Sequence, residues 1–84
     1  MTQQVSQKLL LDQSAIYQIE VPGMIDMSWL EFGKDIKIAV EKDDAGSSFS
    51  TLTGEFDQVA LHGLLRRLYS LGIPLISVVC LDFV

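Results

Sequence analysis

Three side chains able to bind a charged group share one side of a predicted helix. His62, Arg66 and Tyr69 are spaced at i, i+4 and i+7, and residues at this spacing lie on the same side of an α-helix. Together an imidazole, a guanidinium and a phenol could bind a small anion or a carboxylate. The alternative is that His62 and Tyr69 lie at the edge of the core, with the apolar body of each ring inside and its polar tip in water.

The sequence contains no recognisable set of catalytic or metal-binding residues. Its one cysteine, Cys80, falls in an apolar segment, where a thiol is expected to act as a small hydrophobic side chain and not as a nucleophile with His62 as its base. Asp43 and Asp44 lack the spacing and the distal glutamate of a calcium loop. We therefore expect no enzymatic activity, no metal and no cofactor.

Charge and composition narrow the range of partners. The 84 residues carry a formal net charge of −5, and the largest basic cluster is the pair Arg66 and Arg67. Such a charge repels the phosphates of nucleic acids and of anionic membranes. The apolar run at residues 9–11 is too short for a signal peptide or a membrane span. We expect a cytoplasmic protein that binds neither nucleic acid nor membranes.

Alternating and turn-forming residues predict three strands in the first two thirds of the chain. Tyr17, Ile19 and Val21 alternate with polar residues and predict a strand at 15–21. Strands at 36–41 and 49–53 are expected to form a hairpin around the turn at 43–46. A short helix is expected at 27–32, between the first strand and this hairpin. Residues 1–14 read as a polar arm, and residues 15–84 as one α+β domain.

The second helix has the clearest signals. Asp57 is expected to cap it, and Gly72 followed by Pro74 is expected to end it. The leucines that form its apolar stripe are Leu61, Leu64, Leu65, Leu68 and Leu71. A last strand follows at 75–83. The element order, β-α-β-β-α-β, is that of a ferredoxin-like fold with a short first helix and an antiparallel sheet.

We expect the chain to assemble with copies of itself through its last strand. In a ferredoxin-like topology that strand lies at a sheet edge, and here both of its faces are apolar. Such an edge is prone to pair with another chain unless it is covered. Val79, Leu81 and Phe83 are therefore candidate interface residues. Gly63 is a fourth candidate, because a helix without a side chain there could lie close to another subunit.

The segment from Asp57 to Val78 resembles the C-terminal signature of a family of small bacterial proteins. That signature reads Asp-Gln-x-Ala-Leu-His-Gly-Leu-Leu-x-Arg-Leu-x-x-Leu-Gly-x-Pro-Leu-x-Ser-Val, and each of its fixed positions is matched here. Weaker similarity reaches back to residue 16. The family is uncharacterised, so the resemblance implies no activity and no catalytic residue.

Two functions from different classes fit these observations. The first is a non-enzymatic homo-oligomeric module for protein interaction, favoured by the 49% content of apolar residues in a short chain. The second is a regulatory domain that binds a metabolite or an anion between subunits, by analogy with other ferredoxin-like domains. A ligand that raises the melting temperature in a dose-dependent way would favour the second.

Overall fold

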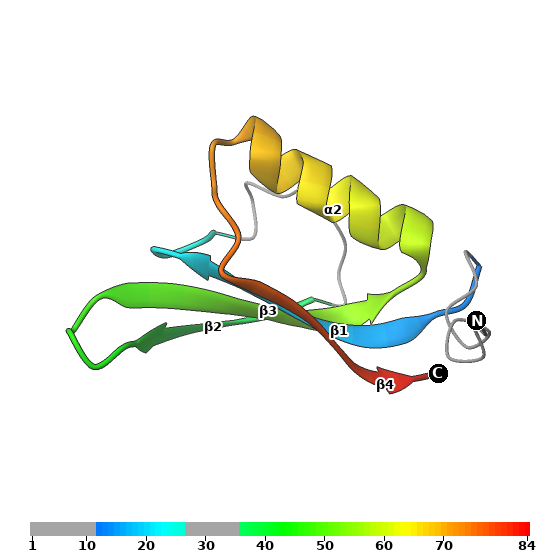
Figure 1. Ribbon diagram of the computed structural model, residues 1–84, viewed down its shortest axis with the longest axis horizontal. Coiled ribbons are helices and arrows are strands. Elements are labelled where there is room, and N and C mark those ends of the chain that lie inside the picture. The colour runs from blue at the N-terminus through cyan, green and yellow to red at the C-terminus, as the bar shows by residue number, and fades with distance from the viewer. Residues whose placement is uncertain (1–11, 27–35) are drawn as a thin grey trace, which may run out of the picture.

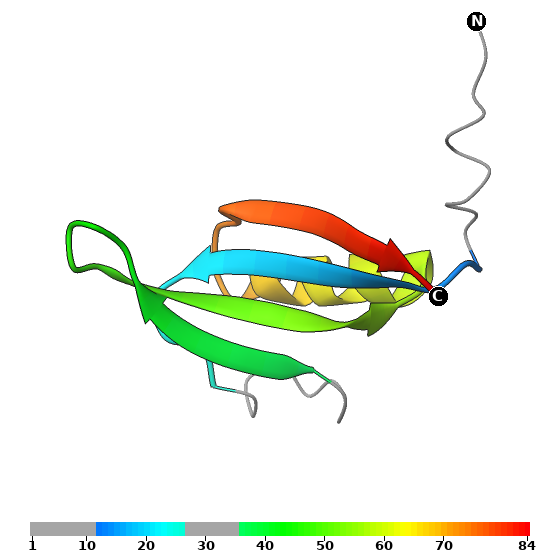
Figure 2. The same ribbon diagram turned by 90° about the horizontal axis from the view of Figure 1, so that it is seen from below.

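An antiparallel sheet is the base on which the rest of the described chain is built. The computed structural model describes residues 12–26 and 36–84. Within them the strands are β1 (Ala15–Pro22), β2 (Lys37–Lys42), β3 (Ser48–Phe56) and β4 (Ser77–Phe83), in the order β2-β3-β1-β4. All neighbouring strands are antiparallel. The two inner strands are therefore β1 and β3, and β2 and β4 form the edges (Figure 2).

The first strand behaves as its alternating residues predict. Tyr17, Ile19 and Val21 are buried, while Gln18 and Glu20 between them are only partly buried. Because successive side chains of a strand point to opposite faces, this pattern separates a core face from an open face. The strand prediction at 15–21 is confirmed, with Pro22 added at its end.

The predicted hairpin is also confirmed. In its turn, Asp43 Oδ1 accepts hydrogen bonds from the backbone N–H groups of Ala45 and Ser47, both at 2.9 Å. Gly46 supplies the positive φ of 85°, a conformation that favours glycine. β3 extends beyond the predicted end at residue 53 because Gly54 stays in the ladder, where it lies opposite Tyr17.

One helix, α2 (Gln58–Ser70), lies over the core face of the sheet (Figure 1). Asp57 caps it as predicted, because its Oδ1 accepts a 2.8 Å hydrogen bond from the N–H of Ala60. At the other end Gly72 has a φ of 77°. The N–H of Gly72 donates to the carbonyl of Tyr69, and the N–H of Ile73 to that of Leu68. These two bonds form the Schellman motif that ends many helices.

The core lies between this helix and the sheet. From α2 it receives Leu61, Leu64 and Leu68, which are buried, while Leu65 is partly buried against them. Leu71 was predicted to continue this stripe, and that prediction is wrong, since its side chain is 41% exposed. The physical reason is that Leu71 is the C-cap residue, so the helix ends there and the chain leaves the helix axis to return to the sheet at β4 (Figure 1). In the described part of the chain, no helix is both long and apolar enough to cross a bilayer.

The described residues establish an α+β fold with one helix and an antiparallel sheet. The ferredoxin-like pattern has two helices, so it is not matched in full within residues 12–26 and 36–84. The expected short helix at 27–32 lies outside the described residues, as does the expected polar arm up to residue 11.

Candidate functional site

The outer strand β4 exposes apolar side chains on both of its faces. It lies at one end of the sheet, and among the described residues no strand pairs with its outer edge. The exposed fractions of its Val78, Val79, Leu81 and Phe83 lie between 38% and 51%. Additional exposed apolar residues flank the strand at both ends. We refer to the following residues as the β4 surface: Leu75, Ile76, Val78, Val79, Leu81, Phe83 and Val84.

Two features of the fold leave this strand uncovered. The helix runs behind β1 for most of its length, and only its N-terminal end overlaps the end of β4 (Figure 2). The ladder between β1 and β4 also shifts register between Ile16, which pairs with Asp82, and Tyr17, which pairs with Cys80. Leu81 is therefore left without a partner on β1, as in a β-bulge. Both faces of β4 consequently keep apolar side chains in contact with solvent.

The opposite edge of the sheet has a different composition. β2 carries Lys37, Glu41 and Lys42 within six residues. Charged side chains on an edge strand oppose pairing with another chain, and natural sheets use them for that purpose. β4 has only Asp82 as a charged residue. The two edges thus differ in the property that governs strand association.

The structure brings together three of the four candidate interface residues. Val79, Leu81 and Phe83 all lie on β4, but Gly63 lies on α2.

A chain of hydrogen bonds connects the surface of α2 to the core. Gln58 Nε2 donates to the hydroxyl of Tyr17 at 2.7 Å, and Gln58 Oε1 lies 3.3 Å from Nε2 of His62. Tyr17 is only 4% exposed. Burial raises the pKa of its hydroxyl above the usual 10.0, with a smaller contribution in the same direction from Cys80, so the phenol stays protonated at neutral pH. Gln58 therefore satisfies a buried polar group that the core could not otherwise accommodate.

The predicted binding residues lie on the outer side of the same helix. His62 and Arg66 are exposed and line a shallow hollow with Gln58 and Val59. Tyr69 does not line it and is 82% exposed. The interpretation of Tyr69 as a residue at the core boundary is therefore wrong, because such a ring would be half covered. The hypothesis of a binding face stays a prediction.

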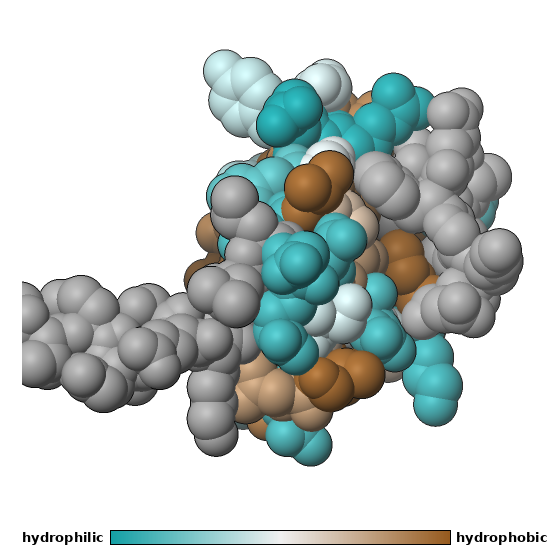
Figure 3. Space-filling view, turned by 90° about the vertical axis from the view of Figure 1, so that its right-hand side faces the viewer, coloured by the Kyte–Doolittle hydropathy of each residue, from teal (hydrophilic) through white to brown (hydrophobic). Residues whose placement is uncertain are grey.

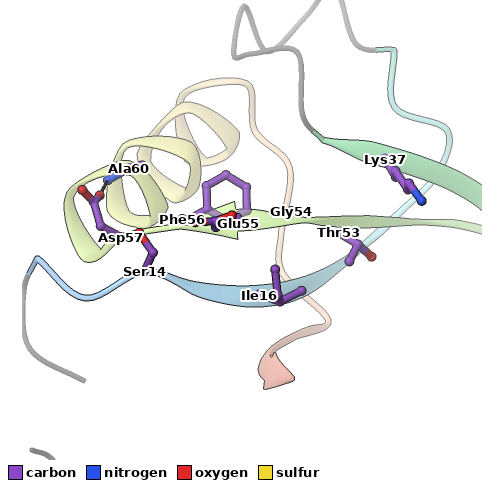
Figure 4. Close-up of a pocket in the computed structure, with 9 residues that line it drawn as sticks. All are labelled: Ser14, Ile16, Lys37, Thr53, Gly54, Glu55, Phe56, Asp57 and Ala60. Carbon is purple, nitrogen blue, oxygen red and sulfur yellow. Dashed lines mark hydrogen bonds between the residues drawn. The ribbon is translucent and has the colours of Figure 1, made fainter. Parts of the chain in front are cut away.

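A larger hollow at the end of the sheet was not foreseen from the sequence. It is lined by residues of β1, β2, β3 and the start of α2, drawn in Figure 4, among them Lys37 and Glu55. Figure 3 views the corresponding end of the molecule, where hydrophobic surface appears in separate patches among hydrophilic residues. No local sequence motif announces it, because its residues come together only through the fold. In the described part of the chain, no three His, Cys, Asp or Glu side chains are grouped to hold a metal ion.

His62→Gln should have only a small effect on stability. The imidazole is exposed and makes a single hydrogen bond, at 3.3 Å, and surface substitutions of this kind change the free energy of unfolding by less than about 1 kcal/mol. The expected fall in melting temperature, measured by circular dichroism, is under about 8 °C. Tyr17→Phe is the comparison, because it removes the buried hydroxyl and leaves the half-buried amide of Gln58 without its partner. A larger fall for His62→Gln than for Tyr17→Phe would contradict this assignment.

Comparison with known proteins gives one match. A protein-family model described as Domain of unknown function (DUF8691) matches residues 16–79. This range agrees with the resemblance to an uncharacterised family found over residues 16–78. No curated protein and no solved structure matches the chain. The description of the family contains no activity, so function has to be argued from the surfaces described above.

Proposed function

We propose that the chain, which belongs to the DUF8691 family of domains of unknown function, is a small non-enzymatic protein that assembles with copies of itself. The observation that carries the proposal is the contrast between the charged edge strand β2 and the apolar edge strand β4. Apolar strand edges associate with other strands unless something covers them. The proposed contact is between the β4 strands of two copies.

The sequence of β4 suits antiparallel pairing with itself about a two-fold axis. With the axis at Val79 or Cys80, the only charged residue of the strand, Asp82, comes to lie opposite the partner's Ile76 or the partner's Val78 respectively. Like charges directly opposite one another destabilise a sheet, and both of these registers avoid them. The result is a continuous sheet of eight strands with α2 of each copy on the same face.

The energetic argument points the same way. A short domain buries a limited fraction of its apolar surface by itself. Completing the burial of a half-exposed Val, Leu or Phe contributes about 1 kcal/mol, and the β4 surface presents several such side chains in each copy. Part of this gain offsets the translational and rotational freedom that association removes. The backbone hydrogen bonds of the new ladder add to it.

We further propose that the fold is the ferredoxin-like arrangement predicted from the sequence. β3 lies between β1 and β2 in the sheet, and β1 lies between β3 and β4. The connection from β1 to β2 therefore passes β3, and the connection from β3 to β4 passes β1. Connections that pass one strand in this way are those of a split β-α-β unit. Backbone chemical shifts of helical character for residues 27–32 would support this proposal, and extended shifts would contradict it.

A small ligand between subunits is the alternative function, and it has weaker support. The hollows of the described chain are shallow and open, whereas small-molecule sites are concave and bury most of their ligand. His62 and Arg66 line one of them, so an anion is the ligand class to screen.

Sedimentation velocity of the purified protein tests the proposed assembly. Across micromolar concentrations we expect the mass of a dimer or a higher oligomer. Cys80 is the only cysteine and lies on the proposed interface strand, so a short thiol cross-linker should join two copies. A monomer mass over the whole range would contradict the proposal.

A further inference from the structure

The outer side of α2 combines exposed apolar groups with positive charge. Val59 and Tyr69 are 75% and 82% exposed, the highest values among the large hydrophobic side chains of the described residues. His62 and Arg66 lie between them in the helix and are exposed as well. We call these four residues the α2 outer face. At 100° per residue they fall within a sector of about 80° of the helix, over a length of about 15 Å.

This face is positive in a chain that is otherwise acidic. Of the 11 Asp and Glu residues of the chain, none lies in α2, which carries Arg66, Arg67 and His62. Within residues 12–26 and 36–84, no carboxylate pairs with the guanidinium of Arg66. The hydroxyl of Ser70 donates a 3.1 Å hydrogen bond to the backbone carbonyl of Arg66 and not to its side chain. Among the described residues, the guanidinium of Arg66 is therefore available to a partner.

We propose that the α2 outer face binds an acidic segment of a partner protein, one that carries aliphatic or aromatic side chains between its carboxylates. Carboxylates of such a segment pair with Arg66 and His62, and its apolar side chains cover Val59 and Tyr69. Complementary charge accelerates association and selects the partner, while the buried aromatic and arginine contribute most of the binding free energy.

Other occupants fit this face less well. A small anion would use Arg66 and His62 but leave Val59 and Tyr69 exposed. A nucleic acid presents regularly spaced phosphates that need a run of cations, and this face offers only Arg66 and His62. The face is also separate from the β4 surface, so the inference does not rest on self-association.

Selection from a display library of random 16-residue peptides, with the wild-type protein as bait, tests the inference. The selected peptides should be enriched in Asp and Glu interleaved with apolar residues. Fluorescence anisotropy of these peptides should show about tenfold weaker binding to Arg66→Glu and weaker binding to Tyr69→Ala. Lys42→Glu, with the same charge change on exposed β2, is the matched control and should bind within about twofold of wild type.

Each other result overturns the inference. Selected peptides without an acidic excess, or no selected peptides at all, would mean that the face does not recognise such segments. Equal losses in Arg66→Glu and Lys42→Glu would assign the binding to net charge alone. Stabilisation by inorganic phosphate or citrate that depends on Arg66, without peptide selection, would make the face a small-anion site. Arg66→Gln repeats the test with a neutral side chain, should Arg66→Glu fail to fold.

Discussion

Val79→Lys should convert the protein from an oligomer into a folded monomer. Val79 lies on the outer strand β4 and is 43% exposed in a single copy, so the lysine ammonium can stay in water and the fold should survive. In the proposed assembly the same position is covered by the partner strand. Two lysines near the two-fold axis would then be desolvated and would repel one another, at a cost of several kcal/mol. Sedimentation velocity measures the mass, and circular dichroism the fold.

Val40→Lys is the matched control for this experiment. Val40 is 46% exposed and lies on the other edge strand, β2, so the substitution, the exposure and the secondary structure are all comparable. Its strand already carries two lysines, and we expect wild-type mass and a wild-type melting temperature. An oligomer that persists in Val79→Lys would show that β4 is not the interface. Dissociation of both variants would attribute the effect to net charge.

The elements predicted correctly are those whose signals are local in the sequence. α2 begins at the side chain of Asp57 and ends at Gly72, and both of these effects act within one helical turn. The turn that joins β2 and β3 depends on Asp43 and Gly46, which contact residues at most four positions away. Interactions of this range are fixed by neighbouring residues, so a short stretch of sequence contains the information.

The errors arose where tertiary contacts decided the outcome. The strand predicted at 49–53 continues to Phe56, because Gly54 stays in the ladder opposite Tyr17. Leu71 matches the apolar spacing of α2, but helix termination removes it from the core. Periodicity describes an ideal helix and says nothing about where the helix ends.

Among the candidate surfaces, too, only the features with local signals could be predicted from the sequence. The exposed apolar strand β4 was predictable from its composition together with the expected topology. The bonds that join Tyr17, Gln58 and His62 were not, since Tyr17 and Gln58 are 41 residues apart in the chain. Only the packing of α2 over β1 brings these side chains together, and no single-sequence pattern encodes that pairing.

Leu68→Ala and Leu71→Ala should differ strongly in stability although they lie three residues apart. Leu68 is fully buried, and deleting a buried leucine lowers the free energy of unfolding by about 2–5 kcal/mol. In a domain of this size each kcal/mol lowers the melting temperature by about 4–8 °C, so a fall of at least about 8 °C is expected.

Leu71→Ala should lower the melting temperature by much less than Leu68→Ala, because Leu71 keeps 41% of its surface exposed in a single copy, whereas Leu68 keeps none. Thermal unfolding of both variants at one protein concentration makes the comparison, since assembly makes the melting temperature depend on concentration. Repeating the comparison in the Val79→Lys background separates burial within one copy from burial against the partner subunit. If Leu71→Ala were as damaging as Leu68→Ala only in the oligomer, the partner subunit would cover Leu71. If it were equally damaging in the monomer, the assignment of Leu71 to the surface would be wrong.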